Sequence, residues 1–128
     1  STYWPRIDTE NHGWINWNWS GEEILSFIRA FGHPYAGAHT LLNNKTFYLK
    51  DCKFVKKKKF HPFQYGLIVN KTKQNLVICV KGGAIQIGNI YNKKRKKINF
   101  KKFKIGDRFF TPIKKLEDAL NKRVYFNL

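Results

Sequence analysis

Two lysine-rich segments hold the side chains that could bind a phosphate or a base. The first, Lys56–Lys59, is followed by an aromatic stretch at 60–65. The second, Lys93–Lys97, is followed by alternating Phe and Lys over 100–104. Lysines neutralise phosphates and aromatic rings stack on bases, so both segments are candidates for nucleic-acid binding. The alternative is two solvated loops whose aromatic residues belong to the core, because alternating Phe and Lys is also typical of an edge strand. The candidate binding residues are Lys56, Lys57, Lys58, Lys59, Lys93, Lys94, Arg95, Lys96 and Lys97.

Residues for bond-making chemistry are scarce by comparison. The serines are Ser1 at the terminus, Ser20 at an expected helix start and Ser26 within that helix. This leaves little for a nucleophile that needs a base and an orienting group. The four histidines show neither i, i+4 spacing nor a nearby Cys at metal-ligand spacing, so a zinc enzyme is a minor alternative. We expect no catalytic residue, no metal and no cofactor in this chain.

The charge of the chain is large and unevenly distributed. The net charge is +17, and residues 45–128 carry 23 basic and four acidic side chains, whereas residues 1–44 carry two basic and four acidic ones. Such a field attracts phosphates, nucleic acids or anionic surfaces. Most of the basic residues are Lys, whereas Arg is the residue suited to bidentate contacts with bases and phosphates. The charge alone therefore leaves the partner open.

Length and composition are those of one folded domain. The chain has 128 residues, of which 42% are hydrophobic, and no apolar run approaches the roughly 20 residues of a membrane span. Two cysteines, Cys52 and Cys79, are too few for a disulfide framework, so we predict buried, reduced thiols in a cytoplasmic protein. A chain without Met that begins Ser-Thr-Tyr-Trp-Pro is expected to be part of a longer protein.

Two helices are predicted, at 20–31 and from 111 onward. Ser20 and Glu23 have the spacing of a capping box, and Ile24, Phe27, Ile28 and Phe31 then fall on one helix face. Gly32 is a plausible stop. The second helix is expected to use Thr111 as N-cap and Pro112 as its first residue, with an apolar face that includes Leu116 and Leu120.

The segment between the helices reads as short strands. Asn43-Asn44 is expected to join 40–42 to 46–49 in a hairpin, and further strands are predicted at 66–70, 75–80 and 84–91, with a possible bulge at Gly88. Residues 98–103 are expected to form a short edge strand. Residues 1–19 look aromatic and irregular. The predicted fold is mainly β with two short helices, a small antiparallel barrel like the oligonucleotide-binding fold.

Residues 6–40 resemble the start of the C-terminal domain of folate-dependent formyltransferases. Those enzymes show a G-x-I-D-W segment, a helix ending in I-R-A and a P-W/Y-P-G-A turn. This chain departs from the pattern at Asn16, where Asp is usual, and at Ala36, where Pro is usual. Residues 76–87 and the Gly-Asp turn at 106–107 are also similar to the family. The matching residues of the first stretch are Gly13, Ile15, Trp17, Ile28, Arg29, Ala30, Pro34, Gly37 and Ala38.

The resemblance implies an enzyme of two domains, of which the N-terminal one is catalytic. The family transfers a formyl group from 10-formyltetrahydrofolate to an amine, and its catalytic residues lie in an N-terminal Rossmann-like domain that this chain lacks. Residues 1–19 would then be a linker and docking segment for that domain, and residues 20–128 would be an OB-like C-terminal domain. The family positions expected to be structural are Gly13, Trp17, Arg29, Pro34, Gly37, Ala38, Gly106 and Asp107.

Two acceptors follow from the family. The positive charge favours methionyl-tRNA, which the C-terminal domain helps to hold in some members. Residues 103–112 and His33-Pro34-Tyr35 look more like the enzymes that formylate amino-sugar nucleotides, which makes that acceptor slightly preferred at this point. A free-standing, basic RNA-binding module is the alternative from a different class of protein.

Overall fold

A five-stranded antiparallel sheet forms the body of the protein. The computed structural model describes residues 3–6, 8–56, 60–121 and 124–127, with side chains over 8–56 and 60–121. The sheet order is β2-β3-β6-β5-β4. Its strands are β2 (Ala38–Leu42), β3 (Lys45–Lys56), β4 (Ile68–Lys71), β5 (Leu76–Val80) and β6 (Gly83–Asn92). The prediction of a mainly β fold is confirmed.

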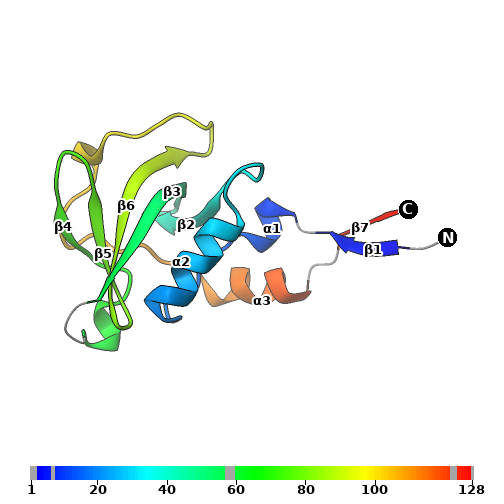
Figure 1. Cartoon of the computed structure of the whole chain (residues 1–128), viewed down its shortest axis with the longest axis horizontal. Coiled ribbons are helices and arrows are strands. Elements are labelled where there is room, and N and C mark those ends of the chain that lie inside the picture. Colours follow the sequence, from blue (N-terminus) through cyan, green and yellow to red (C-terminus); the bar gives the residue numbers. More distant parts are fainter. Residues whose placement is uncertain (1–2, 7, 57–59, 122–123, 128) are drawn as a thin grey trace.

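The α-helices and a second small sheet lie on one side of this body (Figure 1). Within the described residues the α-helices are α1 (Thr9–His12), α2 (Gly21–Ala30) and α3 (Ile113–Asn121), and two 3₁₀ turns are η1 (Pro62–Gln64) and η2 (Phe100–Lys102). Strand β1 (Tyr3–Arg6) pairs antiparallel with β7 (Val124–Asn127). The expected irregular segment 1–19 therefore contains a strand and a short helix. Neither shows a long enough periodic pattern to be recognised from sequence.

The strands alone do not close the expected barrel, since β2 and β4 remain the edges of the sheet. A later segment, 106–110, connects these edges. The amide of Gly106 donates to Ile68 O, Ile68 N donates to Asp107 O, and Phe110 exchanges two backbone hydrogen bonds with Leu41. One irregular segment thus contacts both edges of the sheet, and the backbone of His39 in β2 also exchanges hydrogen bonds with Gly13 and Ile15.

Two local predictions hold at the level of individual residues. Asn43 and Asn44 join β2 to β3 with φ angles of 51° and 64°, as a two-residue hairpin turn requires. Ser20 caps α2, since its Oγ accepts from Glu23 N at 3.2 Å and the Glu23 carboxylate accepts from Ser20 N. Helix α2 then packs its buried residues Ile24 and Ile28 against the sheet.

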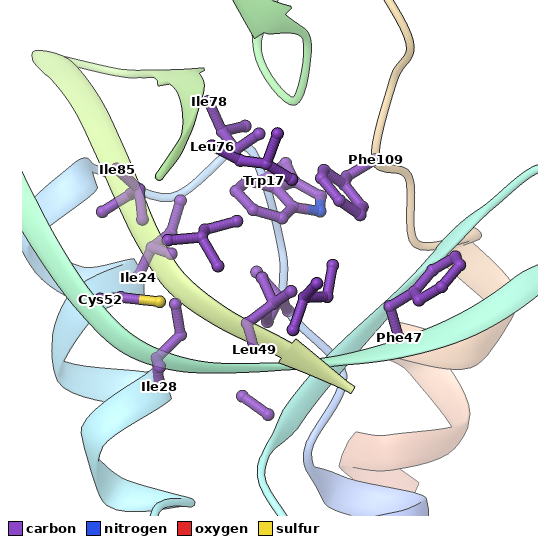
Figure 2. Close-up of a cluster of buried hydrophobic side chains, with 14 of the residues drawn as sticks. Trp17, Ile24, Ile28, Phe47, Leu49, Cys52, Leu76, Ile78, Ile85 and Phe109 are labelled. Carbon is purple, nitrogen blue, oxygen red and sulfur yellow. The ribbon is translucent and has the colours of Figure 1, made fainter. Parts of the chain in front are cut away.

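The core lies between α2, the sheet and the segment before α2 (Figure 2). Trp17 stacks on Phe109, with ring centroids 6.0 Å apart, and its Nε1 donates to Thr40 Oγ1 at 3.0 Å. Ile15 is fully buried in the same cluster. The proposed division at residues 19 and 20 stays a prediction, but Ile15 and Trp17 pack as part of the sheet domain. Any docking role for the Trp-rich segment therefore falls to the partly exposed Trp14 and Trp19.

Three predicted details are wrong. Residues 98–103 contain the turn η2 instead of an edge strand, because the Asn99 side chain accepts from Lys101 N and starts a 3₁₀ turn. Gly88 causes no bulge: β3 and β6 keep one register along their length. It stands where a Cβ would come within 2.7 Å of Asp51 O, so it allows a close approach of the two strands. Helix α3 starts at Ile113, and the Thr111 hydroxyl contacts Thr40 Oγ1 instead of capping it.

The cysteines behave as predicted. Both are free and buried, and burial raises the pKa of the Cys52 thiol to about 12 and that of the Cys79 thiol to about 11. Within the described residues, none of the helices has the length and apolar character needed to cross a membrane.

Candidate nucleic-acid interface

The described parts of the two lysine-rich segments, Lys56 and the 93–97 turn, lie at opposite ends of the sheet. Lys56 ends β3 and pairs with Gly83, the first residue of β6, whereas the 93–97 segment follows Asn92, the last residue of β6. With about 3.3 Å per residue, the length of β6 separates them by ~30 Å. The structure therefore does not bring the predicted residues into one cluster (Figure 1). Lys57, Lys58 and Lys59 lie outside the described residues.

The 93–97 segment is an ordered turn. The Asn92 carboxamide oxygen accepts from Lys94 N at 2.9 Å and from Lys96 N at 3.0 Å, and Asn92 N donates to Lys96 O. Arg95 adopts a positive φ of 68°, and its guanidinium lies 5.1 Å from the ring centre of Tyr48. This turn holds Arg95 on the sheet and leaves the neighbouring lysines exposed.

A basic groove that the sequence did not single out lies farther along the chain, at η2. It encloses about 600 Å³ between the β4–β5 connection and η2, and it is lined by Lys71, Thr72, Lys73, Asn99, Phe100 and Lys101. Lys71 donates to Phe103 O at 2.8 Å, which ties one wall of the groove to the other. The alternating Phe and Lys of 100–104 is the feature of the sequence that could have indicated this groove. That pattern favours a strand, whereas η2 buries Phe100 and leaves Lys101 and Lys102 exposed.

The positive charge of these regions is hardly compensated. Over the described residues a single ion pair forms, between Lys114 Nζ and Asp118 Oδ1 at 3.9 Å on α3. The side chains of Lys93, Lys94, Lys96 and Lys97 are exposed and meet no carboxylate there. Unpaired ammonium groups that share one face repel each other and favour a bound polyanion.

Aromatic and cationic groups also form a continuous row on the sheet. Lys115 lies 5.3 Å from the Trp14 ring, Trp14 packs edge-on against His39 at 4.4 Å, and His39 lies 5.0 Å from Tyr48, which Arg95 covers. Burial lowers the pKa of His39 and raises that of Tyr48. Both rings are therefore neutral near pH 7, and this row stabilises the outer face rather than exposing rings to a ligand.

The family positions lie mainly at close contacts and turns. A Cβ at Gly13 would come within 2.7 Å of Thr9 O and 2.9 Å of the His39 ring. Gly37 has φ +118°, and its carbonyl accepts from His39 Nδ1. Ala38, at 0% exposure, begins β2, and Trp17 belongs to the core.

The remaining family positions are nearer the surface. Arg29 is exposed at the end of α2, where its carbonyl accepts from Gly32 N, and Pro34 is exposed after a cis peptide bond. Gly106 has φ +97°, and the Asp107 carboxylate accepts from Lys104 N at 3.0 Å. Gly106 and Asp107 shape the turn that joins the sheet edges.

The arrangement is suited to binding rather than to covalent chemistry. Over residues 8–56 and 60–121, no three His, Cys, Asp or Glu side chains come together as a metal site would require. Ser20 is engaged as a helix cap, and Thr40, Thr111 and Trp17 share a buried hydrogen-bonded network. The described surface instead offers ammonium groups along a rigid sheet.

These features define a small, mainly β domain with an uncompensated basic surface. The chain belongs to the formyl transferase C-terminal domain family, whose model matches residues 7–108. The predicted resemblance is thereby confirmed.

Similar proteins are methionyl-tRNA formyltransferases of two bacterial genera. The protein of Streptococcus thermophilus is 36% identical over 89 residues, which cover 70% of this chain and 27% of the relative. That of Lactococcus lactis subsp. cremoris is 33% identical over 89 residues, 67% of this chain and 27% of the relative. That of Lactococcus lactis subsp. lactis is 28% identical over 116 residues, 84% of this chain. The chain spans between 27% and 35% of the length of these relatives.

Proposed function

We propose that this chain is the RNA-holding C-terminal domain of a 10-formyltetrahydrofolate-dependent formyltransferase whose acceptor is methionyl-tRNA. The formyl donor and the catalytic residues belong to an N-terminal domain of the complete cytoplasmic enzyme. The observation that carries the proposal is the set of exposed lysines without carboxylate partners along the 93–97 turn and at the groove beside η2. The names of the similar proteins favour tRNA over the amino-sugar nucleotide that residues 103–112 suggested.

A polyanion as long as tRNA suits the separation of Lys56 from the 93–97 turn. A nucleotide sugar carries two phosphates and would meet the lysines of one region only. A duplex RNA arm presents phosphates along its whole length and can contact both ends of a sheet ~30 Å long. Lysines far outnumber arginines among the candidate residues, which suits contacts with phosphate more than reading of bases.

The partner domain has a candidate contact surface on α3. Ile113 and Leu120 are 70% and 81% exposed, and together with the half-buried Leu116 they form an apolar stripe on α3. Because β1 pairs with β7, which follows α3 after two residues, the first described strand of the chain lies beside the continuation of this helix. We propose that the stripe packs on the N-terminal domain of the complete enzyme.

A matched pair of variants tests the RNA role. K96Q/K97Q removes two exposed charges from the 93–97 turn, and K114Q/K115Q removes the same number on α3. Binding of the chain to initiator tRNA is measured by fluorescence anisotropy over a range of salt concentrations. The slope of log K against log[salt] is negative for a protein that binds phosphates. For K96Q/K97Q we expect this slope to become shallower by about 0.9 for each phosphate that the variant no longer neutralises. The slope should stay unchanged in K114Q/K115Q.

Two outcomes would contradict the proposed RNA-binding site. Equal slopes in both variants would mean that the charge acts without a defined site. Negligible tRNA binding at low salt would reject the RNA role altogether.

A further inference from the structure

The turn η1 presents an aromatic pair to solvent. The rings of His61 and Phe63 are stacked with centroids 5.3 Å apart and an angle of 3° between their planes. Phe63 is 80% exposed, and η1 buries none of its own residues. In Figure 1 this turn is the short green helix at one end of the sheet. A parallel, exposed ring pair offers a flat surface that nothing in the described chain covers.

The turn is held rigidly although it contributes nothing to the core. The His61 Nδ1 accepts from Phe63 N at 3.2 Å, and the Gln64 side chain accepts from His61 N at 2.8 Å. From a distant part of the chain, the Arg108 guanidinium donates to Tyr65 O at 2.6 Å and also to Phe63 O. The exposed ring is therefore preorganised, which lowers the entropy lost on binding.

The packing beneath the turn explains how it is fixed. Gly66 has φ +92°, and a Cβ there would come within 2.4 Å of Phe109 O. Its N–H donates to Cys79 O, and its carbonyl accepts from Phe109 N at 2.9 Å. The residue that follows the turn is thus bonded to both β5 and the 106–110 segment, which fixes the end of η1 on the sheet domain.

We propose that η1 is a stacking site for an unpaired base of RNA. The inference rests on the proposed function, because it names a second contact of the same RNA. A single ring surrounded by the polar side chains of His61 and Gln64 is too small for an apolar protein interface, whereas it matches the face of one base. Lys56 and Lys81 are exposed at the same end of the sheet, where β3 pairs with the start of β6, and supply charge for the adjoining phosphates.

The site differs from the basic groove in the kind of RNA it selects. The groove and the 93–97 turn offer ammonium groups, which bind duplex and single strands alike. A stacking ring binds only a base whose face is free. The unpaired end of an RNA hairpin should therefore gain affinity from η1, and a blunt hairpin should not.

The test uses two short RNA hairpins that differ in a single-stranded 3′ overhang carrying 2-aminopurine. Its fluorescence is quenched by stacking, and affinity is measured in parallel by anisotropy. Three variants are compared with the parent chain: F63A, F63W and the matched control F110A, which removes another exposed Phe, at 54% exposure. Circular dichroism establishes that each variant is folded.

We expect the parent chain and F63W to quench the overhang, and F63A to bind the overhang RNA about fivefold or more weakly. F63A should bind the blunt hairpin like the parent, and F110A should change neither RNA. Unchanged overhang binding and quenching in F63A would overturn the stacking site while leaving the RNA role intact. An equal loss for both hairpins would also overturn it, because duplex contacts would then explain the effect. If the parent chain binds neither hairpin at low salt, the proposed function and the stacking site fail together.

Discussion

Helices α2 and α3 are similar in their apolar pattern and opposite in environment. Both are short, and both place apolar residues on one face. Helix α2 buries Ile24 and Ile28 against the sheet, whereas α3 buries no residue and leaves Leu120 81% exposed. The comparison shows that an amphipathic pattern tells which face of a helix is apolar but not what covers it.

Helix α2 is fixed at its start in a way that α3 is not. Gly21 stands so close to Phe54 that a Cβ would lie 2.1 Å from that ring, and Gly21 N donates to Lys81 O. Helix α3 connects to the body through α1 and through Lys115, which lies over Trp14. We infer that α2 unfolds together with the sheet, and that the apolar face of α3 packs on a partner outside the described residues.

The largest difference between α2 and α3 should appear in the free energy of unfolding when an apolar side chain of each helix is truncated to Ala. I24A leaves a cavity in a fully buried site, so we expect a loss of about 2–5 kcal/mol in the free energy of unfolding. Urea titration followed by circular dichroism measures it.

The control for this variant is L120A on α3, which should alter stability by less than about 0.5 kcal/mol. Comparable losses in I24A and L120A would contradict the inferred difference between the helices, since α3 would then be packed in solution.

A smaller effect is expected from the helix cap. S20A removes the acceptor of Glu23 N and should cost about 1 kcal/mol. S26A is the matched control, because Ser26 is exposed within the same helix and Ala is the better helix former there. If S20A and S26A unfold at the same urea concentration, the capping box contributes nothing to α2.

A change in pH should act through His39, whose ring packs against Trp14, the residue that Lys115 of α3 covers. Burial lowers the pKa of His39 from its ordinary 6.5, so the folded state binds this proton less readily than the unfolded state. Stability due to neutral His39 is complete above about pH 6.5 and is lost as the pH falls toward the lowered folded-state pKa.

Urea titrations of the parent and of H39Q between pH 8 and pH 5 measure this contribution. The stability advantage of the parent over H39Q should shrink on acidification. An advantage that grows at low pH would show that the sign of the shift is wrong.

The parts of the fold that were predictable depend on neighbours in sequence. The Asn43-Asn44 turn and the Ser20 cap follow from side chains that act within four residues. The strand predicted at 98–103 is wrong for a local reason. Alternating Phe and Lys is compatible with a strand, and it is equally compatible with the observed 3₁₀ turn, which buries Phe100 and Phe103.

The candidate site was predictable in its residue types and not in its geometry. The lysine segments are visible in the sequence, but the separation of Lys56 from the 93–97 turn depends on the pairing of β3 with β6. The anchoring of η1 depends on Arg108, which is 43 residues from Tyr65. No periodicity carries information over such a distance.

The pairing of β1 with β7 has a consequence for the way this domain can be joined to others. Tyr3 and Asn127 face each other across the ribbon, so their Cα atoms are about 5 Å apart. A segment that starts at β1 and finishes at β7 therefore enters and leaves at one place, so it can be inserted into a loop of a host protein without rerouting the sheet.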